Sequence, residues 1–251
     1  MQRVVVTGLG MISPLGLDME SSWDGLINGK SGVRQIDHFD TSNLKVKIAA
    51  QLPDGFEALL EKRIKKRLQK QMTRSVAMNF ITALMAVEDA GLDFSLLTPE
   101  RCGVIIGASG TDYPSADMAS IEEYDNARVV KSMSNAFPAW ICLHYGLSGP
   151  SLTVGTACSS AGYAMGTAHD FITLGLCDVM IVGGASCSIL PEFMTGFGDM
   201  MALSERDVPP AHASCPFDLK RDGFVMGEGS GVLILESEQL ARKRGARIYS
   251  E

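Results

Sequence analysis

The chain has 251 residues, of which 46% are hydrophobic and 7% aromatic, and its formal net charge is −7. This composition is ordinary for an α/β protein with a sizeable buried core. No apolar run reaches the length of about eighteen residues that a membrane-spanning helix needs, and the start lacks a secretory signal pattern, so we expect a soluble, cytoplasmic protein.

The strand Arg3 to Thr7 is predicted from a β-branched run, with Gly8 and Gly10 forming a tight loop after it. A glycine pair after a strand also occurs in dinucleotide-binding folds. The third glycine of that fingerprint would fall at Ser13, however, and Pro14 follows where a helix should begin. The pattern therefore favours a structural turn over a nucleotide site.

The next elements are a helix capped by Asp18 and running to about Asn28, an irregular stretch over residues 33–56, and a basic helix from Glu57. The apolar side of the first helix carries Trp23, Leu26 and Ile27. A strongly amphipathic helix over Thr73 to Ala90 is predicted to be core scaffold, because its apolar residues recur at helical spacing.

Strands and helices alternate through the rest of the chain, which predicts an α/β fold with a mostly parallel, mixed sheet covered by helices on both faces. The predicted elements are a strand in Arg101–Gly110, a short helix before Lys131, a helix over Ser134–Tyr145, a strand ending at Thr153–Gly155, a helix over Ser159–Leu174, strands at Val179–Gly183 and Val232–Glu236, and a helix over Glu238–Lys243. A further strand begins at Ala246–Tyr249, so we expect the domain to continue beyond Glu251.

Cys158 stands at the turn between a predicted strand and a predicted helix, among the small residues Gly155, Ala157 and Ser159. Small neighbours allow the sharp turn of a nucleophile elbow, which exposes the central side chain. The start of a helix also stabilises a thiolate through its dipole and free N–H groups. The sequence therefore predicts that Cys158 is a nucleophile, with a buried structural thiol as the alternative.

The other five cysteines are expected to be core or bystander residues, and no C-x-x-C pair or paired spacing with histidine predicts a disulfide framework or a metal site. They are Cys102, Cys142, Cys177, Cys187 and Cys215. A thiolate nucleophile usually needs an acid/base partner. His169 lies eleven residues along the helix from Cys158, about 16 Å away, and His38, His144 and His212 are expected at the surface or in the core.

Four stretches resemble the β-ketoacyl-acyl-carrier-protein synthases, above all the elongating ketosynthase-II-like type and the ketosynthases of polyketide assembly. They are Val4–Gly16, Val154–Ala185, Ala202–Asp207 and Pro216–Glu236. The resemblance implies a thiolase-like fold of two similar αβα halves. Residues 1–251 would be the N-terminal half, with the second half beginning near residue 246 and supplying two histidines and a lysine.

The reaction that the resemblance implies is a decarboxylative condensation. Cys158 would take an acyl group from acyl-carrier protein, and its backbone N–H would be one oxyanion donor. Malonyl-carrier protein would then lose CO2 and attack the acyl group, giving a 3-oxoacyl chain for fatty acid or polyketide biosynthesis. No cofactor is implied, because phosphopantetheine arrives on the carrier protein.

A basic segment over Lys62–Arg74 holds seven basic residues and no acidic one, in a chain with 22 basic and 29 acidic residues. Carrier proteins are acidic, so a local positive patch would steer them to the enzyme. The residues that match the family's docking region are Lys65, Lys66, Arg67, Lys70, Arg128 and Lys131. A solvated helix face is the alternative interpretation.

The resemblance also implies a dimer, either of two identical chains or of a ketosynthase with a chain-length factor. In the family, residues 108–133 contribute to the acyl pocket and to the dimer contact. Two other functions stay open: a non-catalytic partner of the chain-length-factor kind, which typically lacks the elbow cysteine, and a non-decarboxylating thiolase-like acyltransferase.

Overall fold

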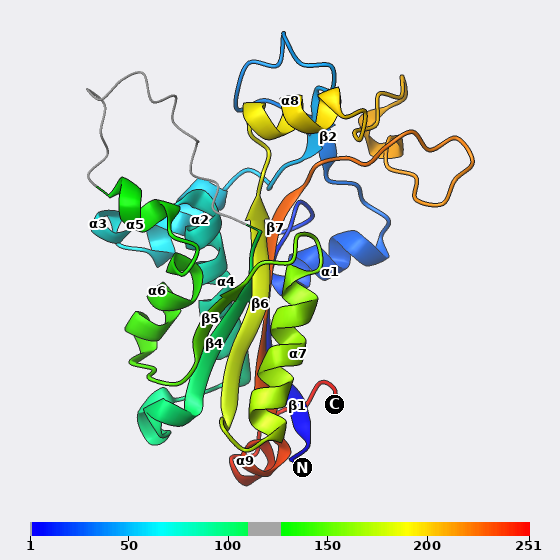
Figure 1. Cartoon of the computed structure of the whole chain (residues 1–251). Coiled ribbons are helices and arrows are strands. Elements are labelled where there is room, and N and C mark those ends of the chain that lie inside the picture. Colours follow the sequence, from blue (N-terminus) through cyan, green and yellow to red (C-terminus); the bar gives the residue numbers. More distant parts are fainter. Residues whose placement is uncertain (1, 110–126) are drawn as a thin grey trace. The chain divides into compact units, whose positions relative to one another are not determined.

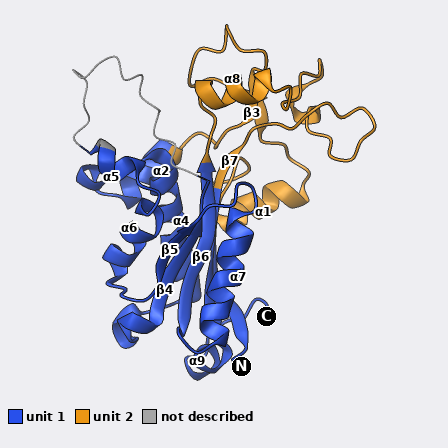
Figure 2. Cartoon of the chain, viewed as in Figure 1, with its two compact units in different colours: residues 1–11, 57–186, 230–251 blue, residues 12–56, 187–229 orange. Residues whose placement is uncertain are grey.

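The computed structural model describes residues 2–109 and 127–251. It contains two compact units, coloured separately in Figure 2. Unit 1 comprises Met1–Met11, Glu57–Ser186 and Ser230–Glu251, and unit 2 comprises Ile12–Phe56 and Cys187–Gly229. Most of the stretch before Lys131 in which a short helix is predicted, and most of the pocket and dimer segment 108–133, lies outside the described residues.

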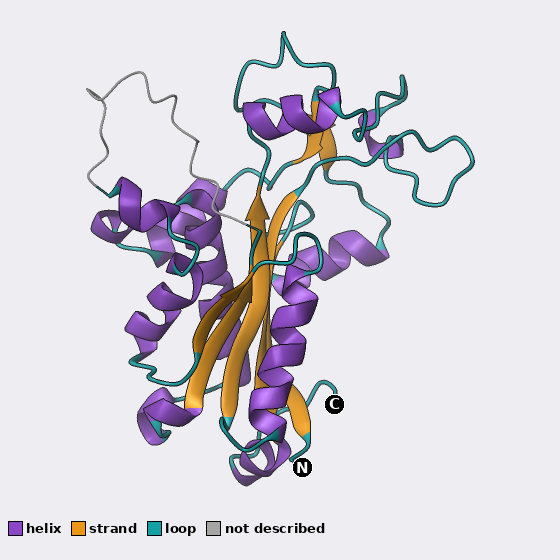
Figure 3. Cartoon of the chain, viewed as in Figure 1, coloured by secondary structure: helices purple, strands orange, loops and turns teal. Residues whose placement is uncertain are grey.

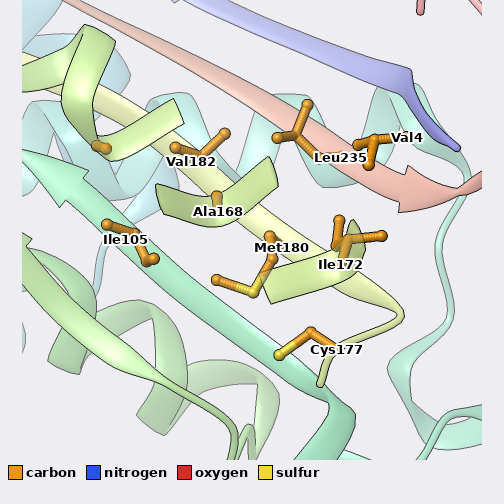
Figure 4. Close-up of a cluster of buried hydrophobic side chains, with 9 residues drawn as sticks. Val4, Ile105, Ala168, Ile172, Cys177, Met180, Val182 and Leu235 are labelled. Atoms are coloured by element: carbon orange, nitrogen blue, oxygen red, sulfur yellow. The ribbon is translucent and has the colours of Figure 1, made fainter. Parts of the chain in front are cut away.

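Unit 1 is built on a five-stranded sheet with the order β1-β7-β6-β4-β5. β4 pairs in parallel with β5 on one side and with β6 on the other, whereas β7 runs in the opposite direction to β4 (Figure 4). The predicted mixed, mostly parallel sheet is therefore confirmed. Its strands are β1 (Val4–Ile12), β4 (Cys102–Gly107), β5 (Ser151–Val154), β6 (Val179–Cys187) and β7 (Glu228–Ser237).

Helices cover both faces of this sheet (Figures 1 and 3). Alternate residues of β7 face opposite sides, since Ile234 lies toward Gly8 and the helix α4, whereas Leu235 belongs to the core under α7. The core under α7 is closed by Val4, Ile105, Met180 and Leu235 from four strands (Figure 4). The helices of unit 1 are α2 (Phe56–Arg63), α3 (Lys66–Gln69), α4 (Arg74–Ala90), α5 (Arg128–Ser132), α6 (Ala136–Tyr145), α7 (Ser160–Thr173) and α9 (Glu238–Lys243).

The helix α4 is the predicted scaffold. The Thr73 hydroxyl accepts a hydrogen bond from the Val76 N–H at its start, and Gly91 ends it in the left-handed conformation with φ 59°. Of its 17 residues, 13 are buried. A larger part of the helix surface is thus buried than the single apolar face that its amphipathic pattern predicts.

The first strand is longer than predicted, and its glycines do not form a loop. β1 extends to Ile12 and includes Gly8 and Gly10. A Cβ on Gly10 would lie 2.1 Å from the carbonyl oxygen of Thr82, and one on Gly8 would lie 2.3 Å from that of Ala86. The glycines are present because α4 packs directly against the strand backbone, which the local sequence pattern does not reveal.

Unit 2 contains a small antiparallel sheet where the sequence predicted an irregular stretch. β2 (Val33–Gln35) pairs with β3 (Ile48–Ala50). A core of Ile36, Val46, Ala49, Ile189, Met194, Leu203 and Met226 packs around it. The two strands have only three residues each, too short for a period-two pattern to be recognised.

The two helices of unit 2 are α1 (Met19–Ile27) and α8 (Pro191–Asp199). Asp18 caps α1 in a capping box with Ser21, as predicted. Its apolar side does not face the core of the described chain, however: Trp23, Leu26 and Ile27 are exposed, and the buried residues are Ser22 and Gly25. A Cβ on Gly25 would lie 2.9 Å from the Cβ of Leu15, so this close packing selects the small face instead.

The end of the described chain adds one antiparallel bridge to β1. The Tyr249 N–H donates to the Val6 carbonyl at 2.8 Å, and the Val6 N–H donates to the Ser250 carbonyl at 2.9 Å. This bridge stands where the sequence predicts the start of a strand. None of the helices within residues 2–109 and 127–251 is both long and apolar enough to cross a bilayer.

Substituting Gly107→Ala should destabilise the protein, because a Cβ at this position on β4 would lie 2.3 Å from backbone atoms of Ser160 and Ala161. We expect a loss of roughly 1–3 kcal/mol of unfolding free energy, measured by denaturant unfolding. Gly231→Ala on β7 is the matched control, since nothing lies within 4 Å of its Cβ position. Equal effects of the two substitutions would contradict the close packing at Gly107.

Candidate active site

Cys158 lies at the turn between β5 and α7, and its side chain is exposed. This is the predicted strand, elbow and helix, with β5 ending at Val154 and α7 beginning at Ser160. Because the strand ends just before the turn and the helix begins just after it, Cys158 stands at the carboxyl edge of the sheet.

The turn is held in a conformation that few residues adopt. Ala157, immediately before the cysteine, has φ 51°, one of three positive φ values at non-glycine residues in the described chain. The Ser160 hydroxyl accepts from the Thr156 N–H at 2.9 Å and donates to the Ala157 carbonyl at 2.7 Å. Ser160 is buried, so these two bonds fix the backbone on both sides of Cys158.

Two glycines in neighbouring strands bring the first turn of α7 onto the sheet. Gly107 ends β4, and its backbone lies against Ser160 and Ala161. Gly184 on β6 lies against the same helix, with its Cβ position 3.0 Å from that of Ala161. Sequence reasoning did not identify Ser160, Gly107 or Gly184 as supporting residues. The signal in the sequence was a glycine in each strand, Gly107 at the end of β4 and Gly184 three residues before the end of β6.

The electrostatic setting of Cys158 comes from α7. The helix has 14 residues and no acidic side chain in its first turn, so its positive end is not neutralised locally. A negatively charged sulfur, or an oxyanion formed next to it, is therefore favoured at this end of the helix. The arrangement can hold a nucleophile, but it does not itself provide a proton acceptor.

The histidines do not supply that acceptor within the described part of the chain, where no hydrogen bond joins a histidine to Cys158. His169 lies on α7 beside Asp170 and Thr173. His144 packs against Phe80 and Tyr145, and burial lowers its pKa. His38 and His212 belong to unit 2.

The remaining thiols differ from Cys158 in their surroundings. Burial raises the pKa of Cys102 to about 12, and burial also raises the pKa values of Cys142 and Cys177. Cys187 is buried. Cys215 is partly buried and accepts a contact from the Arg206 guanidinium at 2.8 Å. Of the six cysteines, all of which lie within the described ranges, Cys158 alone is exposed.

The predicted docking residues fall into two groups. Lys65, Lys66, Arg67 and Lys70 lie on α3 and its two caps, and all four are exposed. Gln69 ties this helix to α2 by donating to the Leu60 carbonyl at 3.3 Å, and it also donates to the carbonyl of Ile64, just after α2, at 2.6 Å. None of these four cations forms an ion pair in the part of the chain that the structure describes. Arg128 and Lys131 lie on α5.

Two acidic side chains pair with cations at the ends of the basic segment instead of with these four. Arg63 pairs with Glu88 through two contacts, and Arg74 pairs with Glu57. These pairs neutralise the ends of the basic segment and leave its middle uncompensated. Within the described ranges, no group of three or more histidine, cysteine, aspartate or glutamate side chains is placed to hold a metal ion.

Alkylation of the native protein should modify Cys158 well before Cys102. The Cys158 side chain is exposed to the reagent, whereas the Cys102 thiol is buried and, with its pKa raised to about 12, stays protonated at about pH 8. Iodoacetamide labelling followed by peptide mass spectrometry measures the order. Labelling of Cys102 at the rate of Cys158 would contradict the site described here.

Comparison with known proteins places the chain in a family. Residues 1–241 match the family model described as beta-ketoacyl synthase, N-terminal domain. The chain is 36% identical to 3-oxoacyl-[acyl-carrier-protein] synthase 2 of Vibrio cholerae over 257 aligned residues, which cover 100% of this chain and 61% of the relative. It therefore spans about three fifths of the length of this relative.

Two solved structures share the fold. One is described as the ishigamide ketosynthase/chain length factor, with a TM-score of 0.86 and 32% identity over 98% of this chain and 61% of that one. The other is a type II polyketide ketosynthase, AntDE, in complex with the acyl-carrier protein AntF, with a TM-score of 0.80 and 30% identity over 99% of this chain and 61% of that one. The fold is thus the expected thiolase-like one, and the chain belongs to the beta-ketoacyl synthase family, of which it carries the N-terminal domain.

Proposed function

We propose that the protein is an acyltransferase that performs a decarboxylative condensation. The observation that carries this proposal is the exposed Cys158 at the amino end of α7, held by Ser160 in a turn that few residues adopt. The names of the relatives, 3-oxoacyl-acyl-carrier-protein synthase and ketosynthase, support the same chemistry.

In the first step the Cys158 thiolate attacks the carbonyl carbon of an acyl-carrier-protein thioester. A new carbon–sulfur bond forms, the carrier's thiolate leaves and takes up a proton, and the acyl group stays on Cys158. Charge develops on the thioester oxygen during the attack. The backbone N–H of Cys158 is the donor we assign to that oxygen, together with a second donor from outside the described residues.

In the second step malonyl-carrier protein loses CO2 and becomes an enolate. The enolate carbon attacks the acyl carbonyl, the bond to the Cys158 sulfur breaks, and a 3-oxoacyl-carrier protein leaves. No cofactor is needed, because the phosphopantetheine arm arrives on the carrier protein. The pathway is fatty acid or polyketide biosynthesis, and we place it in the cytoplasm.

The proposed chemistry needs a second half of the fold, which would contribute the catalytic histidines. The relatives are longer than this chain, which covers 61% of them. The outer face of α7 carries Tyr163 at 61% exposure and Met165 at 39%, and Cβ positions at Gly162 and Gly166 have nothing within 4 Å. This apolar, close-approach face suits a second αβα half, which would bring the histidines that Cys158 lacks. It would begin near residue 246.

The partner we assign is acyl-carrier protein, docked on Lys65, Lys66, Arg67 and Lys70, with Arg128 and Lys131 alongside. These α3 cations are exposed and lack acidic partners among the described residues, in a chain whose net charge is −7. A confined positive patch on an acidic protein attracts an acidic partner to one place. A similar solved structure is a complex of a ketosynthase with its acyl-carrier protein.

A dimer is the assembly we assign, either of two copies or of a ketosynthase with a chain-length factor, as named in one similar structure. The chain-length-factor role itself is the second candidate, because the similar structure contains both kinds of chain. The presence of Cys158 favours the catalytic role. A non-decarboxylating acyltransferase would share the first step and lack the second.

The first test is acylation of the protein together with its second half. After incubation with acyl-carrier protein, intact-mass analysis should find one acyl group on the wild type and none on Cys158→Ala. Cys215→Ala is the matched control and should keep the adduct, since it removes the partly buried thiol of a loop. An adduct that survives in Cys158→Ala would contradict the assignment of Cys158 as the nucleophile.

Adding malonyl-carrier protein to the acylated wild type should then release a 3-oxoacyl product. If no such product forms, the protein performs simple acyl transfer without condensation.

The second test reverses charge on α3. Lys65→Glu with Lys66→Glu should slow acylation by carrier protein about tenfold or more at low ionic strength, because electrostatic steering sets the association rate. Acylation by a small thioester should change less than about twofold. Lys220→Glu with Lys243→Glu, two exposed lysines elsewhere, is the matched control. Equal slowing with both acyl donors would contradict docking on α3.

A further inference from the structure

The imidazole of His38 lies between two oxygen atoms of unit 2. Its Nδ1 is 2.6 Å from Oε1 of Gln51, and its Nε2 is 3.1 Å from the carbonyl oxygen of Ile189. The carbonyl of Ile189 has no hydrogen to give, so Nε2 must be the donor in that contact.

The orientation of the Gln51 amide is fixed by two other contacts. Its Nε2 donates to the Gln35 carbonyl at 2.9 Å, and its Oε1 accepts from the Asp37 N–H at 3.3 Å. Gln51 is buried, and turning the amide over would lose both bonds. The oxygen therefore faces His38, and Nδ1 must be a donor as well.

A neutral imidazole carries one N–H, whereas the imidazolium carries two. Both contacts can be hydrogen bonds only when the ring is protonated. We propose that His38 is a proton-dependent clamp, which joins the end of β3 to the segment before α8 when it is charged. When it is neutral it keeps the shorter contact to Gln51, at 2.6 Å, and releases the segment before α8, whose contact is the longer one at 3.1 Å.

The clamp joins parts of the chain that are far apart in sequence. His38 and Ile189 are separated by 151 positions. Ile189 is buried in the core of unit 2 with Met194 of α8, and α8 begins at Pro191. Gln51 directly follows β3. Opening the Nε2 contact thus loosens the start of α8 from the small sheet.

Few charged groups of the described residues lie near the ring. The nearest is Asp37, whose Oδ1 lies 4.0 Å from Nδ1, but its other oxygen pairs with Arg34 of β2 at 2.7 Å. Glu228, at the start of β7, accepts from the Leu52 N–H. Residues 188–190 bring no titratable side chain. Phe39 packs edge-on at 4.8 Å, and the His38 side chain is 44% exposed, so solvent reaches the ring.

The sign of the effect follows from the donors. The clamp is closed while the ring is charged. As the pH rises the ring loses one N–H, and the deprotonated ring nitrogen and the oxygen that it contacted are then both acceptors, so that hydrogen bond is lost. The segment around Ile189 should therefore open more often at higher pH. The clamp lies within unit 2, and its test does not use Cys158 or any acyl donor.

Hydrogen exchange read by mass spectrometry tests the clamp in the full-length protein. The readout is the protection of peptides covering 188–199, divided by that of peptides from α4 to remove the intrinsic effect of pH. We expect this ratio to fall about five- to tenfold between about pH 6 and about pH 8. His38→Arg, a permanent cation with several donors, should keep the ratio high at both values.

His38→Phe keeps a ring but removes both donors, so the ratio should be low at both pH values. His212→Phe is the matched control and should behave as wild type, since His212 lies on an exposed turn of the same unit. A wild-type ratio that does not change with pH would overturn the clamp. So would a ratio in His38→Phe that falls with pH as in the wild type.

Discussion

The site depends on the close approach between the first turn of α7 and the strand β4. Gly107 has no side chain, so the backbone of Ser160 and Ala161 rests directly on the end of this strand. Ser160 then reaches back to Thr156 and Ala157 with one hydroxyl. A larger residue at position 107 would lift the helix, and the turn that exposes Cys158 would lose its support.

Once the turn is fixed, the electrostatic properties of the site follow from the position of Cys158 at the amino end of α7. The helix dipole acts at its amino end, so it stabilises charge at Cys158 and at an oxyanion beside it. The same helix buries Ala164, Ala168 and Ile172 against the sheet and leaves its other face exposed. One helix thus anchors the nucleophile that we propose, supplies the electric field at its sulfur and presents the surface on which we place a second half. Proton transfer needs groups that α7 does not carry.

Particular elements show why sequence reasoning succeeded and failed. The helices α4 and α9 were located closely, because caps and helical periodicity are local signals. The glycines of β1 were assigned to a loop, because the reason for them is a helix some seventy residues away in sequence. The apolar side of α1 was predicted from the sequence, but the sequence did not show that the packing of Gly25 against Leu15 leaves this side exposed. In both cases a tertiary contact decided the outcome.

The sequence by itself determined the order of the elements, the elbow around Cys158 and the run of cations on α3, because spacing, small residues and charge are properties of adjacent positions. Tertiary structure decided which glycines support the elbow, which cations keep acidic partners and which ring nitrogens of His38 must donate. Those outcomes depend on residues brought together from separate segments, such as Gly107 with Ser160, Arg63 with Glu88 and His38 with Ile189. No local pattern encodes such pairs, since each is formed only when the chain has folded.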